Sequence, residues 1–442
     1  MIGELKSAAV AADPRLGASK GVGRPLVVQI SVWVLALIAV NQWGGAINNR
    51  LSMSVLAPPL FGRFEFGPSW RVILPVALAV LIVCFGHRAA GFLSWPALLG
   101  TAAVAALAWA AALALVDGPS GITEPLERPL DYLANLPLAT GLGDFLEGYA
   151  RDLDTYSLHA QGHPPGALMF FWALDRIGLS GPGPTAAVIL MAAASMVPAV
   201  LLSVRELAGE DLVRRAAPFL VLTPAAVWIA TSADALFMAV GAWGIALMTL
   251  AVKRTGSKSD ILALASGGVL GAGLFMSYGL VPLGLVVIAL GIGLRRIRPL
   301  LVGGSALVLV AGTFAASGFW WFDGLNATLE RYDLGVAQRR PYVYFLVANL
   351  AALSLALGPA VLAGLARLRH RGLWLLCGGA LAAVALSDLS GFTKGEVERI
   401  WLPFVPWLTI AAASLPAAGH RFLLAAQGGV ALAIQIGVRT PW

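Results

Sequence analysis

The sequence contains little charge. Asp, Glu, Lys and Arg make up only 12% of its 442 residues, whereas hydrophobic residues make up 59% and the mean hydropathy is +0.82. A soluble domain carries roughly twice that share of charge. A water-soluble fold is therefore excluded, because it would leave too much apolar surface in contact with water.

Several familiar motifs are also absent. The sequence has no Walker-type phosphate loop, no paired-cysteine metal spacing and no HExxH helix. The GxSxG string at residues 17–21, GASKG, lies in the N-terminal segment outside any predicted strand–turn–helix unit, so it does not indicate a nucleophile elbow. The two cysteines, Cys84 and Cys377, lie inside apolar runs and give no indication of the redox compartment. A soluble nucleotide-binding domain is missing, so the energy for any reaction must come from an ion gradient or from a substrate activated elsewhere.

Long apolar runs alternate with short charged stretches, a pattern typical of a polytopic all-α membrane protein. We expect about thirteen spans, since each needs about 20 predominantly apolar residues. The expected spans are residues 27–45, 71–86, 92–116, 184–204, 216–231, 234–252, 260–277, 279–294, 299–318, 343–365, 372–387, 400–417 and 421–438.

The domain organisation follows from these runs. Residues 26–442 are predicted to form a single transmembrane domain, and residues 1–25 a disordered cytoplasmic tail without a cleavable signal. The longest polar stretch, residues 117–183, is expected to be an outer loop. Within it, residues 166–178 are apolar but too short to span, so they are predicted to form a juxtamembrane helix on the outer interface. The alternative is a short tilted span.

Charge is distributed unequally between the predicted sides of the membrane. With the N-terminus in the cytoplasm, most Lys and Arg residues lie in cytoplasmic segments and most acids lie outside. This is the positive-inside asymmetry, and it predicts a multi-pass protein of the plasma membrane with its polar segments outside. The basic pI of about 9.7 is thus an orientation signal, and no nucleic-acid partner is expected.

Polar residues of chemical interest gather in the predicted outer segments. Charges at the edge of a bilayer are costly unless they pair or serve a site, and the simpler alternative is an ion pair at a helix end. The long loop contains many acids, of which Asp131 is favoured because Tyr132 and the apolar LANLPL segment bring it near the membrane. Pro164 and Pro165 follow His163 and fix an extended entry into the next helix. Asp234 lies between two spans, in the segment TSADALF.

Two segments of the sequence resemble the GT-C superfamily of membrane glycosyltransferases. They are HPPGALMFFWALDRIGLSGPG and RELAGEDLVRRAAPFLVLTPAAVWIATSADALF. The similarity is to the branch that contains protein O-mannosyltransferases and lipid A aminoarabinose transferases. The late GEVERIWLPF segment and the Ala-, Gly- and Val-rich composition resemble actinobacterial members. The match covers roughly residues 117–401 in order and topology, and its motifs are short.

The resemblance implies transfer of a sugar from a polyprenyl-phosphate donor to a lipid or cell-envelope acceptor on the outer face. The implied catalytic residues are Asp131, Asp234 and Glu124, with Glu127 in reserve. The outer polar segments supply the candidate substrate-binding residues, and within them the Lys394–Arg399 group is favoured because apolar residues flank it closely. These candidates are His163, Tyr132, Lys394, Glu396, Glu398, Arg399 and Arg339. No residue separates mannose from arabinose as the sugar, although mannose is slightly favoured.

The predicted chemistry needs no nucleotide, because a lipid phosphate is already a leaving group. A carboxylate would deprotonate the acceptor hydroxyl, while Arg399 and Lys394 would stabilise the departing phosphate. A divalent cation (Mg, Mn or Ca) could share that task. Single displacement would invert the anomeric configuration.

Two other functions remain open. Many spans and membrane-edge charges also suit a transporter or flippase, although the spans show no inverted repeat. A scaffold of a polymer-assembly complex is the third reading. An assay that follows radiolabel from a polyprenyl-phosphate sugar into a lipid or polymer product distinguishes the glycosyltransferase from these alternatives.

Overall fold

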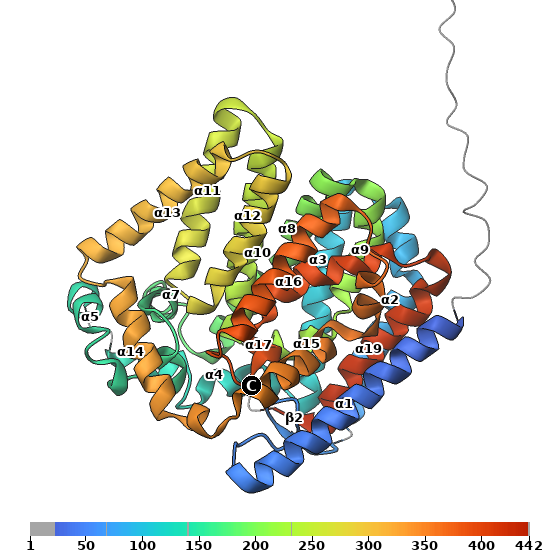
Figure 1. The fold of residues 1–442 in the computed structure, drawn as a ribbon, viewed down its shortest axis with the longest axis horizontal. Helices are drawn as coiled ribbons and strands as arrows, with labels where there is room; N and C mark the ends of the chain where they lie inside the picture. The colour runs from blue at the N-terminus through green and yellow to red at the C-terminus, as the bar shows by residue number, and fades with distance from the viewer. Residues whose placement is uncertain (1–22, 68, 139–140, 231, 441–442) are drawn as a thin grey trace, which may run out of the picture.

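Helices dominate the computed structural model, which describes residues 23–67, 69–138, 141–230 and 232–440 (Figure 1). The predicted all-α polytopic fold is confirmed. Most of the expected tail, residues 1–22, lies outside the described residues. The strands β1 (Arg63–Phe64) and β2 (Val438–Arg439) pair antiparallel and join the loop after the first helix to the end of the chain.

The elements follow one another as a succession of helices with short 3-10 turns. The α-helices are α1 (Gly23–Leu51), α2 (Ile73–Phe92), α3 (Trp95–Ala114), α4 (Ser120–Glu127), α5 (Leu142–Gly148), α6 (Leu158–Gln161), α7 (Pro165–Arg176), α8 (Pro182–Ala208), α9 (Glu210–Val221), α10 (Ala233–Lys253), α11 (Gly256–Leu274), α12 (Gly284–Gly293), α13 (Arg298–Ala316), α14 (Trp321–Leu334), α15 (Tyr342–Leu365), α16 (Arg371–Leu389), α17 (Val397–Ile400), α18 (Val405–Thr409) and α19 (His420–Gly437). The 3-10 helices are η2 (Trp70–Val72), η3 (Leu115–Asp117), η4 (Tyr132–Leu138), η5 (Leu153–Thr155), η6 (Pro224–Trp228), η7 (Tyr278–Leu283), η8 (Val336–Arg339), η9 (Leu402–Phe404), η10 (Ile410–Ser414) and η11 (Ala417–Gly419).

Eight helices of the described residues are long and apolar enough to cross a membrane. They are Leu26–Leu51, Trp70–Phe92, Trp95–Asp117, Pro182–Ala208, Ala233–Lys253, Arg298–Ala316, Tyr342–Leu365 and Arg371–Leu389. A ninth span results if Val397–Ser414 and Ala417–Gly437, which meet at a 115° bend, count as one. The expected count of about thirteen is therefore corrected to eight or nine by length and composition.

Most of the difference arises where an apolar run does not form one long helix, and in one case, α11, a continuous helix is too polar to count. The run 216–231 breaks at Pro224, where α9 has already ended and η6 begins. The run 279–294 divides into the 3-10 helix η7 and the ten-residue α12. The helix α11 is continuous, but its first turns contain the polar residues Ser257–Asp260, which lower its hydropathy. Hydropathy alone counts these residues as spans because it does not register where the backbone turns.

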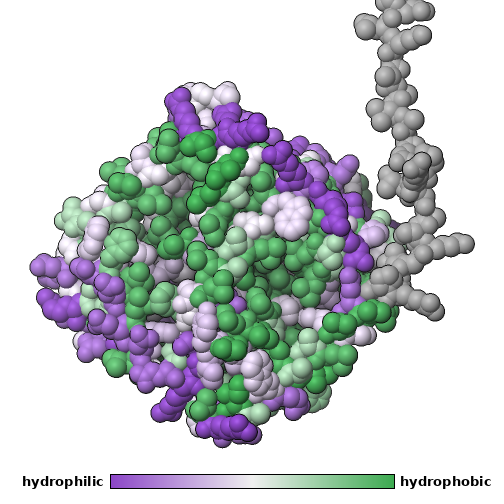
Figure 2. Space-filling view, viewed as in Figure 1, coloured by the Kyte–Doolittle hydropathy of each residue, from purple (hydrophilic) through white to green (hydrophobic). Residues whose placement is uncertain are grey.

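The two ends of the bundle differ. Figure 2 shows hydrophilic residues at the top and lower left of the view, separated by a mainly hydrophobic band. At the top, the turns between α10 and α11 and between α12 and α13 lie together, and Arg254 pairs with Glu206 at 2.8 Å. At the lower left lie α4, α5, α7 and α14, so the long polar loop occupies the opposite end of the bundle (Figure 1). The candidate site is built at this end.

Candidate functional site

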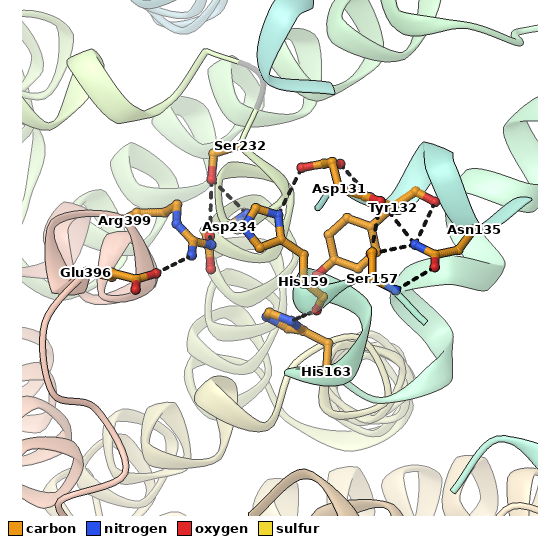
Figure 3. A network of polar contacts seen from close by, with 10 residues as sticks. All are labelled: Asp131, Tyr132, Asn135, Ser157, His159, His163, Ser232, Asp234, Glu396 and Arg399. Carbon is orange, nitrogen blue, oxygen red and sulfur yellow. Dashed lines mark hydrogen bonds and ion pairs between the residues drawn. The ribbon is translucent and has the colours of Figure 1, made fainter. Parts of the chain in front are cut away.

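Polar side chains from distant parts of the sequence form a connected network beside the long loop (Figure 3). One half surrounds Asp131 at the start of η4. The other half surrounds Asp234 in the first turn of α10. Burial, together with the nearby carboxylates of Asp234 and Asp131, holds the pKa of Tyr132 well above its ordinary value. The Tyr132 ring lies beside the rings of His159 and His163, at centroid distances of 6.2 and 5.8 Å (Figure 3).

The Asp131 half is held rigidly. One carboxylate oxygen, Oδ1, accepts the backbone N–H of Tyr132 at 2.7 Å, and Oδ2 lies 3.0 Å from Nδ1 of His159. The amide of Asn135 donates to the Asp131 carbonyl at 3.0 Å and to the Ser157 hydroxyl at 2.6 Å. Asp131 is only 6% exposed. These contacts fix both the carboxylate and the imidazole next to it.

The Pro-Pro turn places His163 beside the Asp131 half of the network. Pro165 occupies the first turn of α7, where its missing N–H costs nothing. Nδ1 of His163 lies 2.8 Å from the carbonyl of His159 and donates to it. The ring lies 5.8 Å from Tyr132 and 5.3 Å from Phe237. This enclosure lowers the pKa of His163 to about 4, because burial disfavours the charged imidazolium.

The Asp234 half is a buried ion-pair chain. The Ser232 hydroxyl caps α10 by accepting the Asp234 N–H at 3.2 Å. Oδ2 of Asp234 lies 2.6 Å from Nη1 of Arg399, and Nη2 of Arg399 lies 3.0 Å from Oε2 of Glu396. The Asp234 and Arg399 side chains are only 3% and 8% exposed. Arg399 therefore has its charge balanced by two carboxylates within the protein.

The loop before α17 is anchored by Asn349 of α15. Its amide nitrogen donates to Asp388 at 2.9 Å and to the Thr393 carbonyl at 2.8 Å. Its amide oxygen accepts the Gly395 N–H at 3.1 Å. Glu396 then adopts a left-handed backbone with φ of 63°, which is unusual for a residue other than glycine. Asn349 thus positions the loop that presents Lys394 and Glu396.

A second guanidinium, that of Arg340, lies behind this loop. Nη1 donates to the Lys394 carbonyl at 2.6 Å and lies 3.6 Å from Glu396. Nε donates to the Met53 carbonyl at 3.3 Å. Arg340 is 6% exposed, yet its Nη2 has no hydrogen-bond partner among the described residues. The buried Tyr332 hydroxyl is close to the Lys394 backbone, and burial raises the pKa of Tyr332 to about 12.

Three predicted residues lie away from this network. Glu124 lies in α4, where it pairs with Arg128 at 3.0 Å and lines an open cleft with Asp117 and Arg439. Glu398 is fully buried and accepts the Phe61 N–H at 2.8 Å, so it attaches the loop after α1 to the bundle.

Arg339 is exposed on η8, and its neighbour Arg340 enters the site instead. The sequence alone does not show which of two adjacent arginines in a loop is buried, because that depends on the geometry of the turn.

Sequence reasoning missed the partners that orient the predicted residues. His159 was recognisable only as one more loop histidine, and Asn135 and Asn349 stood in no motif. One signal could have found His159. It precedes His163 by four residues, which is the spacing that brings two side chains to one face of a helical turn.

The carboxylate oxygens of the network are not arranged as a set of free ligands for a metal ion. Asp131 is bound by His159 and a backbone N–H, while Asp234 and Glu396 both pair with Arg399. Among the described residues, no group of three or more His, Cys, Asp or Glu side chains could hold a metal ion. These residues do not fit a divalent cation, which needs several free oxygen ligands. We therefore assign no step of the reaction to a metal ion.

Comparisons with known proteins give little further guidance. No protein-family model and no curated protein matches the chain. Among solved structures, it is similar to the crystal structure of ArnT from Cupriavidus metallidurans in the apo state. That match has 17% sequence identity and a TM-score of 0.40, covering 62% of this chain and 54% of ArnT. The chain thus spans about half the length of ArnT, and so weak a likeness carries no argument about activity.

Proposed function

We propose that the protein is a membrane glycosyltransferase that moves a sugar from a polyprenyl-phosphate donor to a lipid or cell-envelope acceptor at the outer face. The observation that carries this proposal is the convergence of Asp131, Asp234, His163 and Arg399 in one network. These residues come from three separate parts of the sequence. Their segments are also the ones that resemble GT-C glycosyltransferases.

The network provides the two charges that this chemistry needs. A base in the Asp131–His159 pair would take the proton of the acceptor hydroxyl as the hydroxyl attacks the anomeric carbon. The bond from that carbon to the phosphate oxygen breaks, and its electron pair leaves with the polyprenyl phosphate. A single displacement of this kind inverts the anomeric configuration. Mannose or arabinose is the proposed sugar.

The departing phosphate fits best beside Arg340 and Lys394. Arg399 is already neutralised by Asp234 and Glu396, so it has little positive charge left for a ligand. Arg340 shares one carboxylate at 3.6 Å and keeps one N–H group without a hydrogen bond in the described structure. A buried donor left in this way costs free energy, which a phosphate oxygen would recover. We assign Arg399 the task of holding Asp234 and Glu396 in place.

The deciding experiment follows radiolabel from polyprenyl-phosphate mannose or polyprenyl-phosphate arabinose. Proteoliposomes that contain the full chain should convert the label into a new lipid or glycan product. Arg340→Lys should raise the KM for donor at least about tenfold, because it loses the fork that binds phosphate. Arg151→Lys, an exposed arginine paired with Asp152 in the same outer loop, is the matched control. Movement of an unmodified solute without labelled product would favour the transporter instead.

A further inference from the structure

The acid favoured as the base is fully engaged by the protein. Asp131 Oδ1 accepts the Tyr132 N–H and Oδ2 contacts His159. Asp234 is neutralised by Arg399 and hydrogen-bonded by Ser232 at 3.1 Å. Both carboxylates already accept hydrogen bonds within the protein, so an acceptor hydroxyl would have to compete with those donors. The proton acceptor must therefore be sought next to them.

The contact with Asp131 decides the tautomer of His159. An ionised carboxylate can only accept hydrogen bonds, so the proton of the neutral imidazole must be on Nδ1. The lone pair is then on Nε2, at the far edge of the ring. Nε2 has no hydrogen bond to another described residue, and the side chain is 20% exposed. Figure 3 places the ring between Asp131 and Asp234.

The backbone of His159 is also fixed. Its N–H donates to the Leu130 carbonyl at 3.1 Å, and its carbonyl accepts Nδ1 of His163 at 2.8 Å. His163 has an unprotonated Nε2 as well, but it lies deeper, against Tyr132 and Phe237. Enclosure there lowers its pKa to about 4, so it is a poor proton acceptor near neutral pH. Of the two histidines, only His159 combines an orienting carboxylate with an accessible lone pair.

We infer that His159 is the catalytic base of the transfer and that Asp131 is its positioning residue. Nε2 takes the proton of the acceptor hydroxyl while the hydroxyl oxygen bonds to the anomeric carbon. The sugar–phosphate bond breaks in the same step, and its electrons leave on the polyprenyl phosphate. Asp131 holds the ring and stabilises the imidazolium that forms. This inference rests on the proposed glycosyl transfer. It assigns the proton of the acceptor hydroxyl to Nε2 of His159 instead of to the Asp131 carboxylate.

The test uses His159→Asn in the full-length protein. The Asn amide can still donate to Asp131 from near the position of Nδ1, but it has nothing at the position of Nε2. We expect kcat to fall about 100-fold or more, the usual contribution of a general base, with the KM for donor nearly unchanged. The acidic limb of the wild-type pH–kcat profile should disappear, and added imidazole should restore part of the rate. A purely structural role would produce neither of the last two effects.

The controls keep the outcomes separate. His370→Asn removes an imidazole that caps α16 and should keep the wild-type pH profile. His159→Gln provides a second variant if His159→Asn does not fold. A His159→Asn or His159→Gln protein with kcat within about threefold of wild type and an unchanged pH profile would overturn the inference but leave the transferase intact. A wild type that transfers no sugar would instead overturn the proposed function, and the assignment of its base with it.

Discussion

At the scale of single residues, the site contains a buried charge pair whose partners depend on each other. Asp234 and Arg399 are both almost fully enclosed and lie 2.6 Å apart. Neither charge could remain in this position alone, because its desolvation would not be compensated. A second carboxylate, that of the partly exposed Glu396, extends the pair into a chain. The consequence is that stability and activity should respond together to changes here.

Asp234→Asn is expected to lower the free energy of unfolding by about 3 kcal/mol, because it removes a carboxylate charge 2.6 Å from the buried Arg399 guanidinium. Denaturation of the protein in mixed detergent micelles measures this value. The matched control is Glu206→Gln, which breaks the more exposed pair with Arg254 and should cost about 0–1 kcal/mol. Equal losses for the two variants would contradict the assignment of Asp234 to a buried pair.

The enclosed imidazole of His163 predicts a dependence of stability on pH. Its pKa is about 4 in the folded protein, below the ordinary value of 6.5, so folding favours the neutral form. The contribution is complete above pH 6.5 and is lost as the pH falls from there towards 4. His163→Gln should flatten this part of the stability curve, as measured by thermal unfolding across that range. An unchanged slope would show that another group carries the effect.

Glu124 is expected to contribute little to catalysis, since it lies in a separate cleft with Arg128 and Arg439. We expect Glu124→Gln to change kcat by less than about threefold, well below the contribution of a general base. The radiolabel assay described above measures it. A loss of 100-fold would mean that the cleft belongs to the reacting centre.

At the scale of elements, the loop between α16 and α17 depends on a residue of α15. Asn349 makes three hydrogen bonds that hold Asp388, Thr393 and Gly395 together. Gly395 has a φ of +96°, and a side chain there would approach Phe345 at 3.1 Å. The conformation of the loop therefore depends on the hydrogen bonds that Asn349 makes.

Asn349→Leu should loosen this loop without removing any charged residue. Buried N–H and C=O groups left unpaired cost about 1–3 kcal/mol each, so local opening becomes easier. We expect faster amide hydrogen exchange confined to residues 390–396, together with a higher KM for donor. The comparison variant is Asn48→Leu, because the Asn48 side chain accepts one hydrogen bond, from the backbone N–H of Val55. Exchange that rises equally across the whole bundle would indicate general destabilisation instead.

At the scale of the whole molecule, the two polar ends decide the orientation in the membrane. Arg254, Arg296 and Arg371 lie at one end, where Arg296 donates to the Arg254 carbonyl and Arg371 to the Gly293 carbonyl. The candidate site lies at the other end. The positive-inside rule predicts that the arginine-rich end faces the cytoplasm.

Cysteine labelling in intact cells tests this orientation. In a background with Cys84 and Cys377 replaced by Ala, Asp154→Cys should react with a membrane-impermeant maleimide from outside. Lys258→Cys should react only after the membrane is made permeable. The reverse result would place the site in the cytoplasm and remove the proposed extracytoplasmic reaction.

The sequence by itself determined the membrane class of the protein and the segments that make up its candidate site. Scarcity of charge, long apolar runs and the bias of Lys and Arg are properties of local composition, so they needed no coordinates. Asp131, Asp234 and Arg399 stood out because charge beside apolar sequence is costly wherever the chain folds.

Only the tertiary structure decided the partners of these residues. It paired Asp234 with Arg399 across 165 positions, placed His159 beside Asp131 and chose Arg340 over Arg339. It also reduced the expected spans, because breaks at Pro224 and near Pro416 depend on how the backbone turns. Hydrogen-bond partners and helix breaks arise from packing between distant segments, and hydropathy along a single chain contains no record of that packing.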